Sequence, residues 1–245
     1  MRHEEPTLDG MPEPPPAWVR PEHAVRMPAQ DLDRMLAAAL PHTVDDDDMP
    51  VLATVLLEVD DGLLTTLATD RFTAIRERRP IDQGCDPFTF MLRRDDAGSL
   101  RVLLKSLLRG MKEEERDAEP VDLALEHTPD GPTLRVLGHD LDVRFTQADH
   151  GVLEFPDVER LVDRHLQLLD EHPAATFPVT LNPTLLGRLV PAQRAGRGST
   201  PFRFRCARIP DRTNAPVIAE PHWDDDDLVV LLMPVTEVQL PQAGA

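Results

Sequence analysis

The sequence has little cysteine and no long apolar run, and both absences narrow the class of protein. Its two cysteines, Cys85 and Cys206, lie far apart and belong to no motif, so a reducing compartment is the simplest setting. No apolar run approaches the roughly 20 residues that span a bilayer. The N-terminal residues lack the apolar segment of a secretion signal. The sequence therefore predicts a cytoplasmic protein with no membrane partner.

Motifs for catalysis are also missing. The chain has no Gly-rich phosphate loop and no Gly-x-Ser-x-Gly elbow. Acidic runs at 45–48 and 224–227 lack EF-hand spacing, and such runs in loops are usually solvated. His222, Trp223 and Asp224 have no second His or Cys at metal-ligand spacing. We expect no enzymatic activity, no metal and no cofactor, and a metal-dependent enzyme is the weakest function class considered.

Basic charge is scarce overall. The formal net charge is −18, with only 26 Lys and Arg residues, which argues against a protein that coats nucleic acid with its whole surface. DNA contact through a locally basic face stays open, so the distribution of the cations matters more than their sum. Helix-turn-helix, zinc-finger and aromatic-platform signals are absent, so any DNA binding should be independent of sequence.

What the chain does contain is a recurring pattern. Residues 1–20, rich in Pro and Glu, predict a disordered tail. From about Val25 a short strand, an amphipathic helix and several strands follow one another, and this order occurs three times. In the first round the strand AVRMP precedes the helix AQDLDRMLAAAL, whose apolar residues share one face: Leu32, Met35, Leu36 and Leu40.

The first round continues with three strands, VLATVLLEV, LLTTLATD and FTAIRERRPI. Asp60–Asp61–Gly62 between the first two predicts a tight hairpin. In the second round FTFMLRR precedes the helix at 97–112, which carries a stripe of Leu100, Leu103, Leu104, Leu107 and Leu108. The strands VDLALEH, TLRVLGH and LDVRFTQA follow, and residues 154–173 predict a connector with some helix.

The third round runs from the strand TFPVTL into the helix NPTLLGRLVPAQ. Asn182 predicts its N-cap, Pro183 its first turn and Pro191 an early end or kink. The strands PFRFRCARI, APVIAEP and DLVVLLMPVTEV close the chain. Together these rounds predict an α+β fold of βαβββ repeats, with a curved, mostly antiparallel sheet and helices on one face.

Local strings add a family resemblance. LTTLATDRFTAIRERRPI resembles the part of the central domain of bacterial DNA sliding clamps, the DNA polymerase III beta subunit family, that carries a Thr-Asp step before a turn. GVLEFPDVERLV is similar to the linker that leaves this domain, and TFPVTLNPTLLGRLV to the strand and helix that open the second half of the last domain. VVLLMPVTEV is similar to the C-terminal strand with its Met-Pro pair. The similarity extends from about residue 25 to 240.

The resemblance also implies a shortened chain. A clamp chain of this family has three domains, or six repeat units. Here residues 21–150 resemble the central domain with two units, 151–175 the linker, and 176–240 the second half of the last domain. The first domain and half of the last are missing from the pattern. These parts close the ring in the family, so a ring would need self-association or pairing with a full-length clamp.

In the clamp family, partner proteins insert a short apolar-aromatic peptide between the central and last domains. The resemblance carries this pocket over to matching positions: Leu52, Thr69, Arg71, Phe72, Thr73, Ala74, Leu231, Met233, Pro234 and Val235, with Val162 at the rim. A flexible thioether such as that of Met233 suits a site that takes different ligands. Arg71 to Ala74 replace the family's Gly-His-Arg-Leu turn, so peptide preference is expected to differ. The alternative is that these are ordinary core residues of strands.

The resemblance places the helices against DNA. Helix 97–112 carries a basic stripe opposite its leucines, and the third helix and its loop add further cations: Arg101, Lys105, Arg109, Lys112, Arg188, Arg194 and Arg197. The first helix offers only Arg34, beside Asp31 and Asp33. Such a stripe suits non-specific contact with phosphates. The alternative is a solvated polar face.

These observations favour a non-catalytic, sliding-clamp-like processivity or tethering factor. It would hold DNA polymerase or repair proteins through their clamp-binding peptides and contact double-stranded DNA non-specifically. The alternative is a clamp-derived regulatory module that binds peptides and does not encircle DNA, which the missing half-domains and the acidic first helix favour.

Overall fold

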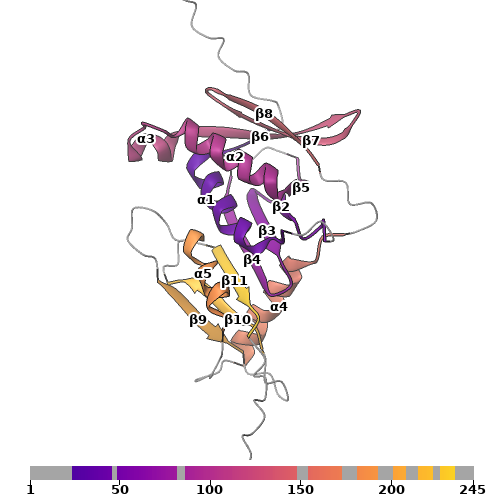
Figure 1. Ribbon diagram of the computed structural model, residues 1–245, viewed down its shortest axis with the longest axis vertical. Coiled ribbons are helices and arrows are strands. Elements are labelled where there is room, and N and C mark those ends of the chain that lie inside the picture. The colour runs from indigo at the N-terminus through magenta and orange to yellow at the C-terminus, as the bar shows by residue number, and fades with distance from the viewer. Residues whose placement is uncertain are drawn as a thin grey trace, which may run out of the picture.

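A computed structural model describes residues 24–45, 49–81, 86–147, 154–172, 181–192, 201–207, 215–222 and 227–234 of the chain. Within these ranges the order of elements follows the predicted repeats (Figure 1). Pairings between the described strands are all antiparallel. None of the helices in this part of the chain combines the length and apolar character required to cross a membrane.

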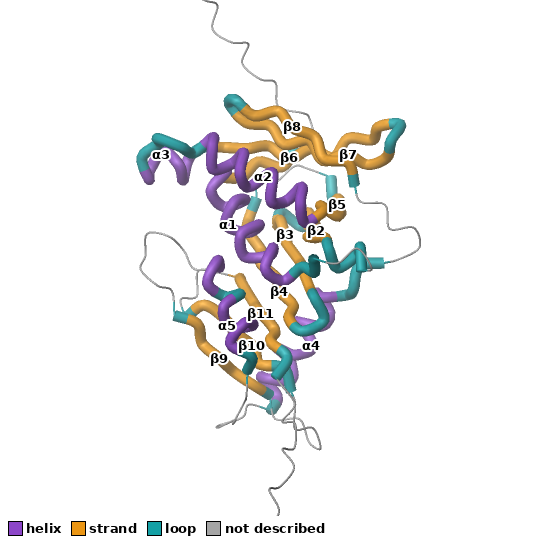
Figure 2. Tube along the Cα trace, viewed as in Figure 1, coloured by secondary structure: helices purple, strands orange, loops and turns teal. Residues whose placement is uncertain are grey.

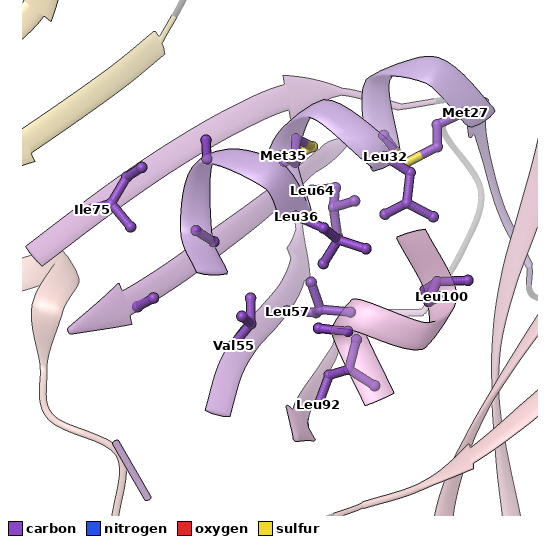
Figure 3. Close-up of a cluster of buried hydrophobic side chains, with 14 of the residues drawn as sticks. Met27, Leu32, Met35, Leu36, Val55, Leu57, Leu64, Ile75, Leu92 and Leu100 are labelled. Carbon is purple, nitrogen blue, oxygen red and sulfur yellow. The ribbon is translucent and has the colours of Figure 1, made fainter. Parts of the chain in front are cut away.

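The first unit consists of β1 (Val25–Pro28), α1 (Ala29–Ala39), the 3-10 helix η1 (Leu40–His42), β2 (Thr54–Asp60), β3 (Leu63–Thr69) and β4 (Thr73–Pro80). The hairpin between β2 and β3 turns through Asp61 and Gly62, with φ of 46° and 74°. Two positive φ angles in a two-residue loop match the twist of the strands. The predicted apolar face of α1 is buried, and Figure 3 shows Leu36 among Leu57, Leu64 and Leu100.

The second unit consists of β5 (Phe88–Arg93), α2 (Arg94–Leu107), α3 (Glu113–Ala118), β6 (Pro120–Thr128), β7 (Gly131–Gly138) and β8 (Leu141–Thr146). α2 begins at Arg94 rather than at 97, directly after β5, and ends at Leu107 rather than at 112. The predicted helix stops early because Gly110 turns the chain with a φ of 84°, and Lys112 is already the N-cap of α3. The sequence analysis did not predict α3, whose residues are mostly charged and of which none is buried.

The first two units exchange their first strands. β1 pairs with β6, so that the first sheet has the order β1-β6-β7-β8, while β5 pairs with β2 in the other sheet. Arg26 on β1 reaches the buried Asp122 on β6 with Nε 2.9 Å from Oδ1. Each sheet therefore needs a strand from the neighbouring unit, and the two units share one core.

The third unit comprises α5 (Pro183–Gly187), η2 (Val190–Ala192), β9 (Phe202–Cys206), β10 (Val217–Pro221) and β11 (Asp227–Leu232). Asn182 caps α5, since its side chain accepts from the N–H of Thr184 at 2.9 Å, as predicted. The strand expected at 176–181 lies almost wholly outside the described residues. β11 pairs with β4, which joins this unit to the first in a seven-stranded sheet of order β5-β2-β3-β4-β11-β10-β9.

Helices cover both faces of the seven-stranded sheet. Residues of α1, α2 and α5 pack with one face in the large core, as the repeats predict. The opposite face packs with α4 (Val158–Glu171), the connector, which is one continuous helix capped by Asp157. Figures 1 and 2 show α4 apart from the other helices, at the side of the sheet away from α1 and α5. The linker is thus a structural layer of the fold.

The orientation of α2 gives a direct test of this packing. Leu100 is fully buried and Val102, two residues later, is 68% exposed. Leu100→Ala should lower the free energy of unfolding by about 2–5 kcal/mol because it leaves a cavity, whereas Val102→Ala should change it by less than about 0.5 kcal/mol. Urea unfolding of both variants measures the difference. Equal losses would contradict the described face of α2.

Candidate partner-binding site and DNA-facing helices

The Met-Pro strand lies directly beside the Thr-Asp turn. Leu232 at the end of β11 is opposite Thr73 at the start of β4. One residue further on, the N–H of Met233 donates to the carbonyl of Phe72 at 2.9 Å. Two segments more than 150 residues apart in sequence, 69–74 and 231–234, therefore meet where the first and third units join.

Asp70 organises the turn between β3 and β4. One of its carboxylate oxygens, Oδ1, accepts from the N–H of Phe72 at 3.1 Å, the N–H of Thr73 at 2.7 Å and the hydroxyl of Thr73 at 2.8 Å. Arg71 has a φ of 76°, in the left-handed region that a side chain rarely adopts. The bonds to Asp70 hold this conformation, and they leave Phe72 projecting outward with 61% of its surface exposed.

Arg188 of the third unit forms hydrogen bonds with the same turn. Its guanidinium donates to Oδ2 of Asp70 and, at 2.9 Å, to the hydroxyl oxygen of Thr73. The sequence analysis predicted that Arg188 contacts DNA; in the structure its side chain forms this ion pair with a buried carboxylate. A charge engaged in this way stabilises the junction between units, because breaking it would leave the Asp70 carboxylate buried without its cation.

A buried histidine completes the network. Nδ1 of His42 is 2.9 Å from the hydroxyl oxygen of Thr73. Because the hydroxyl hydrogen of Thr73 goes to Asp70, Nδ1 must carry a proton and donate, which leaves Nε2 as a bare acceptor. Nε2 is buried and has no hydrogen-bond partner among the described residues. Burial, reinforced by the charge of Arg188 and opposed by that of Asp70, lowers the pKa of His42 to about 3.

The predicted pocket residues divide into a buried and an exposed group. Ala74 and Leu231 on the sheet and Val162 on α4 belong to one apolar cluster, together with Val158 and Val229. Each of the three has less than 4% of its surface exposed. They are brought together, as the sequence analysis expected, in the contact between α4 and the sheet.

The exposed group lies at the end of the strand pair. Phe72 and Met233 are exposed by 61% and 42%, and Arg71 is exposed beside them. Thr69 and Thr73 are buried in the turn, and Pro234 is half-buried. Leu52 lies in the loop before β2, where its carbonyl accepts from the N–H of Val44 at 3.0 Å. Val235 lies outside the described residues.

A cleft of about 680 Å³ lies between α1, α2 and α3, and three cations of the predicted stripe line it: Arg101, Lys105 and Arg109. Its charged lining residues are Asp33, Arg34, Arg101, Lys105, Arg109, Glu113 and Arg116. Arg101 donates to Asp33 at 3.0 Å, and Arg34 lies 3.4 Å from Asp31. Lys105, Arg109 and Lys112 are exposed and form no ion pair within the described part of the chain. Arg194 and Arg197 lie outside it.

Side chains with other chemistry are few in the described residues. No group of three or more His, Cys, Asp or Glu residues there could hold a metal ion, although most of both acidic runs and Trp223 lie outside these ranges. Cys206 is a free, buried thiol at the end of β9. Burial raises the pKa of this thiol, which makes it a poor nucleophile. Cys85 is outside the described residues.

The sequence analysis predicted a connector with some helix at 154–173, and α4 lies within it as one continuous helix. Its full extent could have been predicted, because Asp157 precedes apolar residues at 158, 162, 166 and 169, a helical spacing. The network of His42, Asp70 and Arg188 had no sequence signal, since its members come from η1, a turn and the end of α5.

Comparison with known structures identifies the architecture. No protein-family model matches the sequence, and no curated protein matches it. The structure is nevertheless similar to the DNA polymerase sliding clamp of Pseudomonas aeruginosa, with a TM-score of 0.64 over 91% of this chain and 70% of that one, at 16% identity. The fold is that of a bacterial sliding clamp.

Two further clamp structures are also similar to this chain. The beta subunit of DNA polymerase III from Thermotoga maritima matches 93% of this chain and 69% of its own, with a TM-score of 0.56 and 14% identity. A Pseudomonas aeruginosa clamp bound to griselimycin matches 95% and 68%, with a TM-score of 0.63 and 15% identity. The resemblance inferred from the short strings is therefore confirmed at the level of the fold, for a chain that matches 68–70% of the length of these three clamps.

The buried network predicts that acid destabilises the protein. Unfolded His42 binds a proton below its ordinary pKa of 6.5, whereas the folded form does so only near pH 3. The unfolded state therefore holds more protons between these values, and stability falls as the pH falls through that window. By pH 5 the loss attributable to His42 should be about 2 kcal/mol.

Urea unfolding at pH 7 and pH 5 measures this loss. His42→Gln keeps a polar side chain and cannot titrate, so its stability should change less between the two pH values than that of the wild type. His165, a half-buried histidine on α4 whose Nδ1 lies 2.8 Å from the carbonyl oxygen of Leu161, offers the control His165→Gln. If the His42 variant and the wild type lose stability equally, His42 is not the group responsible.

Proposed function

We propose that this protein is a non-catalytic, sliding-clamp-like tethering factor that binds partner peptides where its first and third units join. The observation that carries the proposal is the β4–β11 pairing, which brings Phe72 and Met233 together at an exposed edge. The partners would be DNA polymerase or repair proteins. The clamp fold, common to all the similar structures described above, supports this role.

The patch has the properties of a peptide-docking surface. Phe72 and Met233 are large and apolar, yet both are exposed, and exposed aromatic and Met side chains are enriched at interfaces. The turn beneath Phe72 is already fixed by Asp70 and Arg188. Little conformational entropy of this turn is therefore lost when a peptide binds. The griselimycin-bound clamp supports ligand binding by proteins with this fold.

Met233→Asp tests the peptide site. A carboxylate at this position would be partly desolvated under a bound apolar peptide without a partner, which should weaken binding by about 2 kcal/mol, or roughly 30-fold. The measurement is a titration with a fluorescently labelled, apolar-aromatic clamp-binding peptide. Val102→Asp, an equally apolar and exposed position on α2, is the control and should bind as the wild type does. Equal affinity of both variants would remove the assignment of Met233.

DNA contact would come from exposed cations at the C-terminal end of α2 and in the segment that joins it to α3. Lys105, Arg109 and Lys112 are without ion-pair partners in the described residues. Lys105 lies in the last turn of α2, Arg109 follows the helix, and Lys112 is the N-cap of α3. Phosphates attract such charges whatever the base sequence. Binding should therefore be non-specific and steeply dependent on salt.

Charge reversal separates a phosphate contact from a solvated face. Lys105→Glu with Arg109→Glu should reduce retention on double-stranded DNA and lower the slope of affinity against salt by about 2, or roughly 0.9 for each lost contact. Arg160→Glu with Arg164→Glu, an identical charge change at exposed positions of α4 on the other face, is the control. Fluorescence anisotropy at several salt concentrations gives both quantities. Undiminished retention would mean that α2 does not contact DNA.

A second candidate is a regulatory module that binds peptides and does not encircle DNA. It is favoured by the engagement of Arg34, Arg101 and Arg188 with Asp31, Asp33 and Asp70, which neutralises part of the predicted basic surface. The same DNA titration decides between the two functions, because the module predicts no salt-dependent retention even for the wild type.

A further inference from the structure

β8 forms one edge of the four-stranded sheet. It pairs with β7 on one side, and no strand among the described residues pairs with its other side, which we call the open edge. Figure 1 shows β8 at the end of the molecule opposite α4 and β9. An edge strand presents a row of unpaired backbone N–H and C=O groups, and such a row is a template for pairing with another chain.

β8 lacks the features that usually protect an edge from such pairing. Edge strands are often very short, or they carry Pro, Lys or a bulge. β1, at the other edge of the same sheet, has only four residues and ends in Pro28. β8 has six residues, LDVRFT, with neither Pro nor Lys among them. Its register with β7 continues through the whole strand without a bulge, so the strand is long and regular enough to accept another.

The hydrogen bonds between β7 and β8 determine which residues face the open edge. The N–H of Gln147, directly after the strand, donates to the carbonyl of Pro132 at 2.8 Å. Hydrogen-bonded and non-hydrogen-bonded pairs alternate along an antiparallel ladder. Every second residue back along β8 from Gln147 therefore also bonds to β7. The residues between them, which include Asp142 and Arg144, direct their backbone groups toward the open edge.

The side chains of β8 complement a second copy of the same strand. In an antiparallel pair the open-edge residues of the two copies lie opposite one another. The register centred on Val143 places Asp142 of each copy opposite Arg144 of the other, and Leu141 opposite Phe145. A shift of two residues in either direction would place Asp142 or Arg144 opposite itself, and like charges directly opposite are destabilising. Charge therefore selects one register.

Both charged side chains are accessible to a second copy. Arg144 and Asp142 are exposed by 48% and 47%. Their contacts within the chain lie on the same sheet, where Arg135 is 2.8 Å from Asp142 and Arg144 is 3.2 Å from Glu126. A carboxylate accepts several hydrogen bonds and a guanidinium has five N–H donors. Each side chain can therefore add a partner across the open edge and keep its present one.

β9, an edge of the seven-stranded sheet, does not have this complementarity. Its sequence is FRFRC. Pairing of two β9 strands in a register centred on Arg203, Phe204 or Arg205 places arginine opposite arginine, which is unfavourable. The pattern of charge therefore favours self-association through β8 rather than through β9.

We infer that two copies of this chain associate through β8, in the antiparallel register centred on Val143, and form a symmetric dimer in which the two four-stranded sheets become one. Because each copy contributes the same surface, the contact closes after two copies. The dimer goes beyond the proposed function and does not depend on the peptide site, which lies in the other sheet, so either can fail alone. A dimer would carry two Phe72–Met233 patches and hold two partner peptides, which raises avidity.

Charge reversal across the open edge tests the dimer. Sedimentation equilibrium of the full chain should show reversible dimerisation as its concentration rises. Asp142→Arg and Arg144→Asp should each weaken the dimer by about tenfold or more, because each turns two attractive pairs into two repulsive ones. The two changes together restore opposite charges across the edge and should recover most of the affinity. Arg203→Asp, at an exposed position of β9, is the control and should leave the dimer unchanged.

Each alternative result contradicts the inference. A wild type that stays monomeric at every concentration overturns it, as does a dimer that neither single change at the open edge weakens. A loss caused by Arg203→Asp would place the contact at β9 instead. A double variant that dimerises no better than the single ones would rule out the proposed register.

Disulfide cross-linking tests the register without changing any charge. At the centre of the contact Val143 lies opposite itself in a non-hydrogen-bonded pair, where Cα atoms are about 4.5 Å apart, a separation that a disulfide can span. Under mild oxidation Val143→Cys should give a linked dimer. The wild type and Val102→Cys, at an exposed position of α2, should remain largely unlinked. Equal linking of all three proteins, or none for Val143→Cys, would show that the strands do not meet at this residue.

Discussion

Hydrogen bonds between β4 and β11 join the first and third units, and the remaining features of the candidate site depend on this pairing. It extends from Thr73 opposite Leu232 to Arg78 opposite Asp227. Without it, Met233 would not lie beside Phe72, and Arg188 would not reach Asp70. The pairing also makes the sheet continuous, so that α4 can pack across strands of two units. One backbone interaction therefore positions both the exposed and the buried parts of the site.

The two faces of the seven-stranded sheet differ in how far their cations are paired with carboxylates. On the face covered by α4, Arg76 and Arg78 are engaged by carboxylates from the helix and from β11. On the face with α1 and α2, Asp33 engages Arg101, while Lys105 and Arg109 remain exposed and without an ion pair among the described residues. An acidic chain can in this way keep a small basic surface, because its carboxylates are placed selectively beside the cations that hold the fold together.

Much of the fold could be predicted because its elements follow local rules. The leucine spacing of α1 and α2, the Asp61–Gly62 hairpin and the Asn182 cap all appeared where the sequence placed them. The bounds of α2 and the presence of α3 could not be predicted, since the leucine stripe continues to Leu108, past the end of the helix at Leu107, and α3 has no apolar face. Adjacency of the Thr-Asp turn and the Met-Pro strand came from the family resemblance rather than from periodicity.

The limits of prediction at the site have a physical cause. Periodicity predicts that Ala74 and Leu231 are apolar strand residues, but it does not predict which element packs against them. In the structure that element is the connector helix α4. Likewise Arg188 reads as a surface cation in a short helix, and only the tertiary fold brings it to Asp70. A charged residue's role depends on which carboxylate lies within reach, which the order of residues along the chain does not encode.

The exchange of first strands between the two N-terminal units has a consequence for how the chain is made. Arg26 on β1 and its partner Asp122 on β6 are separated by 96 positions. During synthesis, β1 leaves the ribosome before β6 has been made. Until then the backbone N–H and C=O groups of β1 that pair with β6 form hydrogen bonds with water or with other parts of the chain. Because closing such a long loop is slow relative to local helix formation, α1 and the β2–β3 hairpin would be in place first. The growing chain would then complete the four-stranded sheet only after β6 has been made.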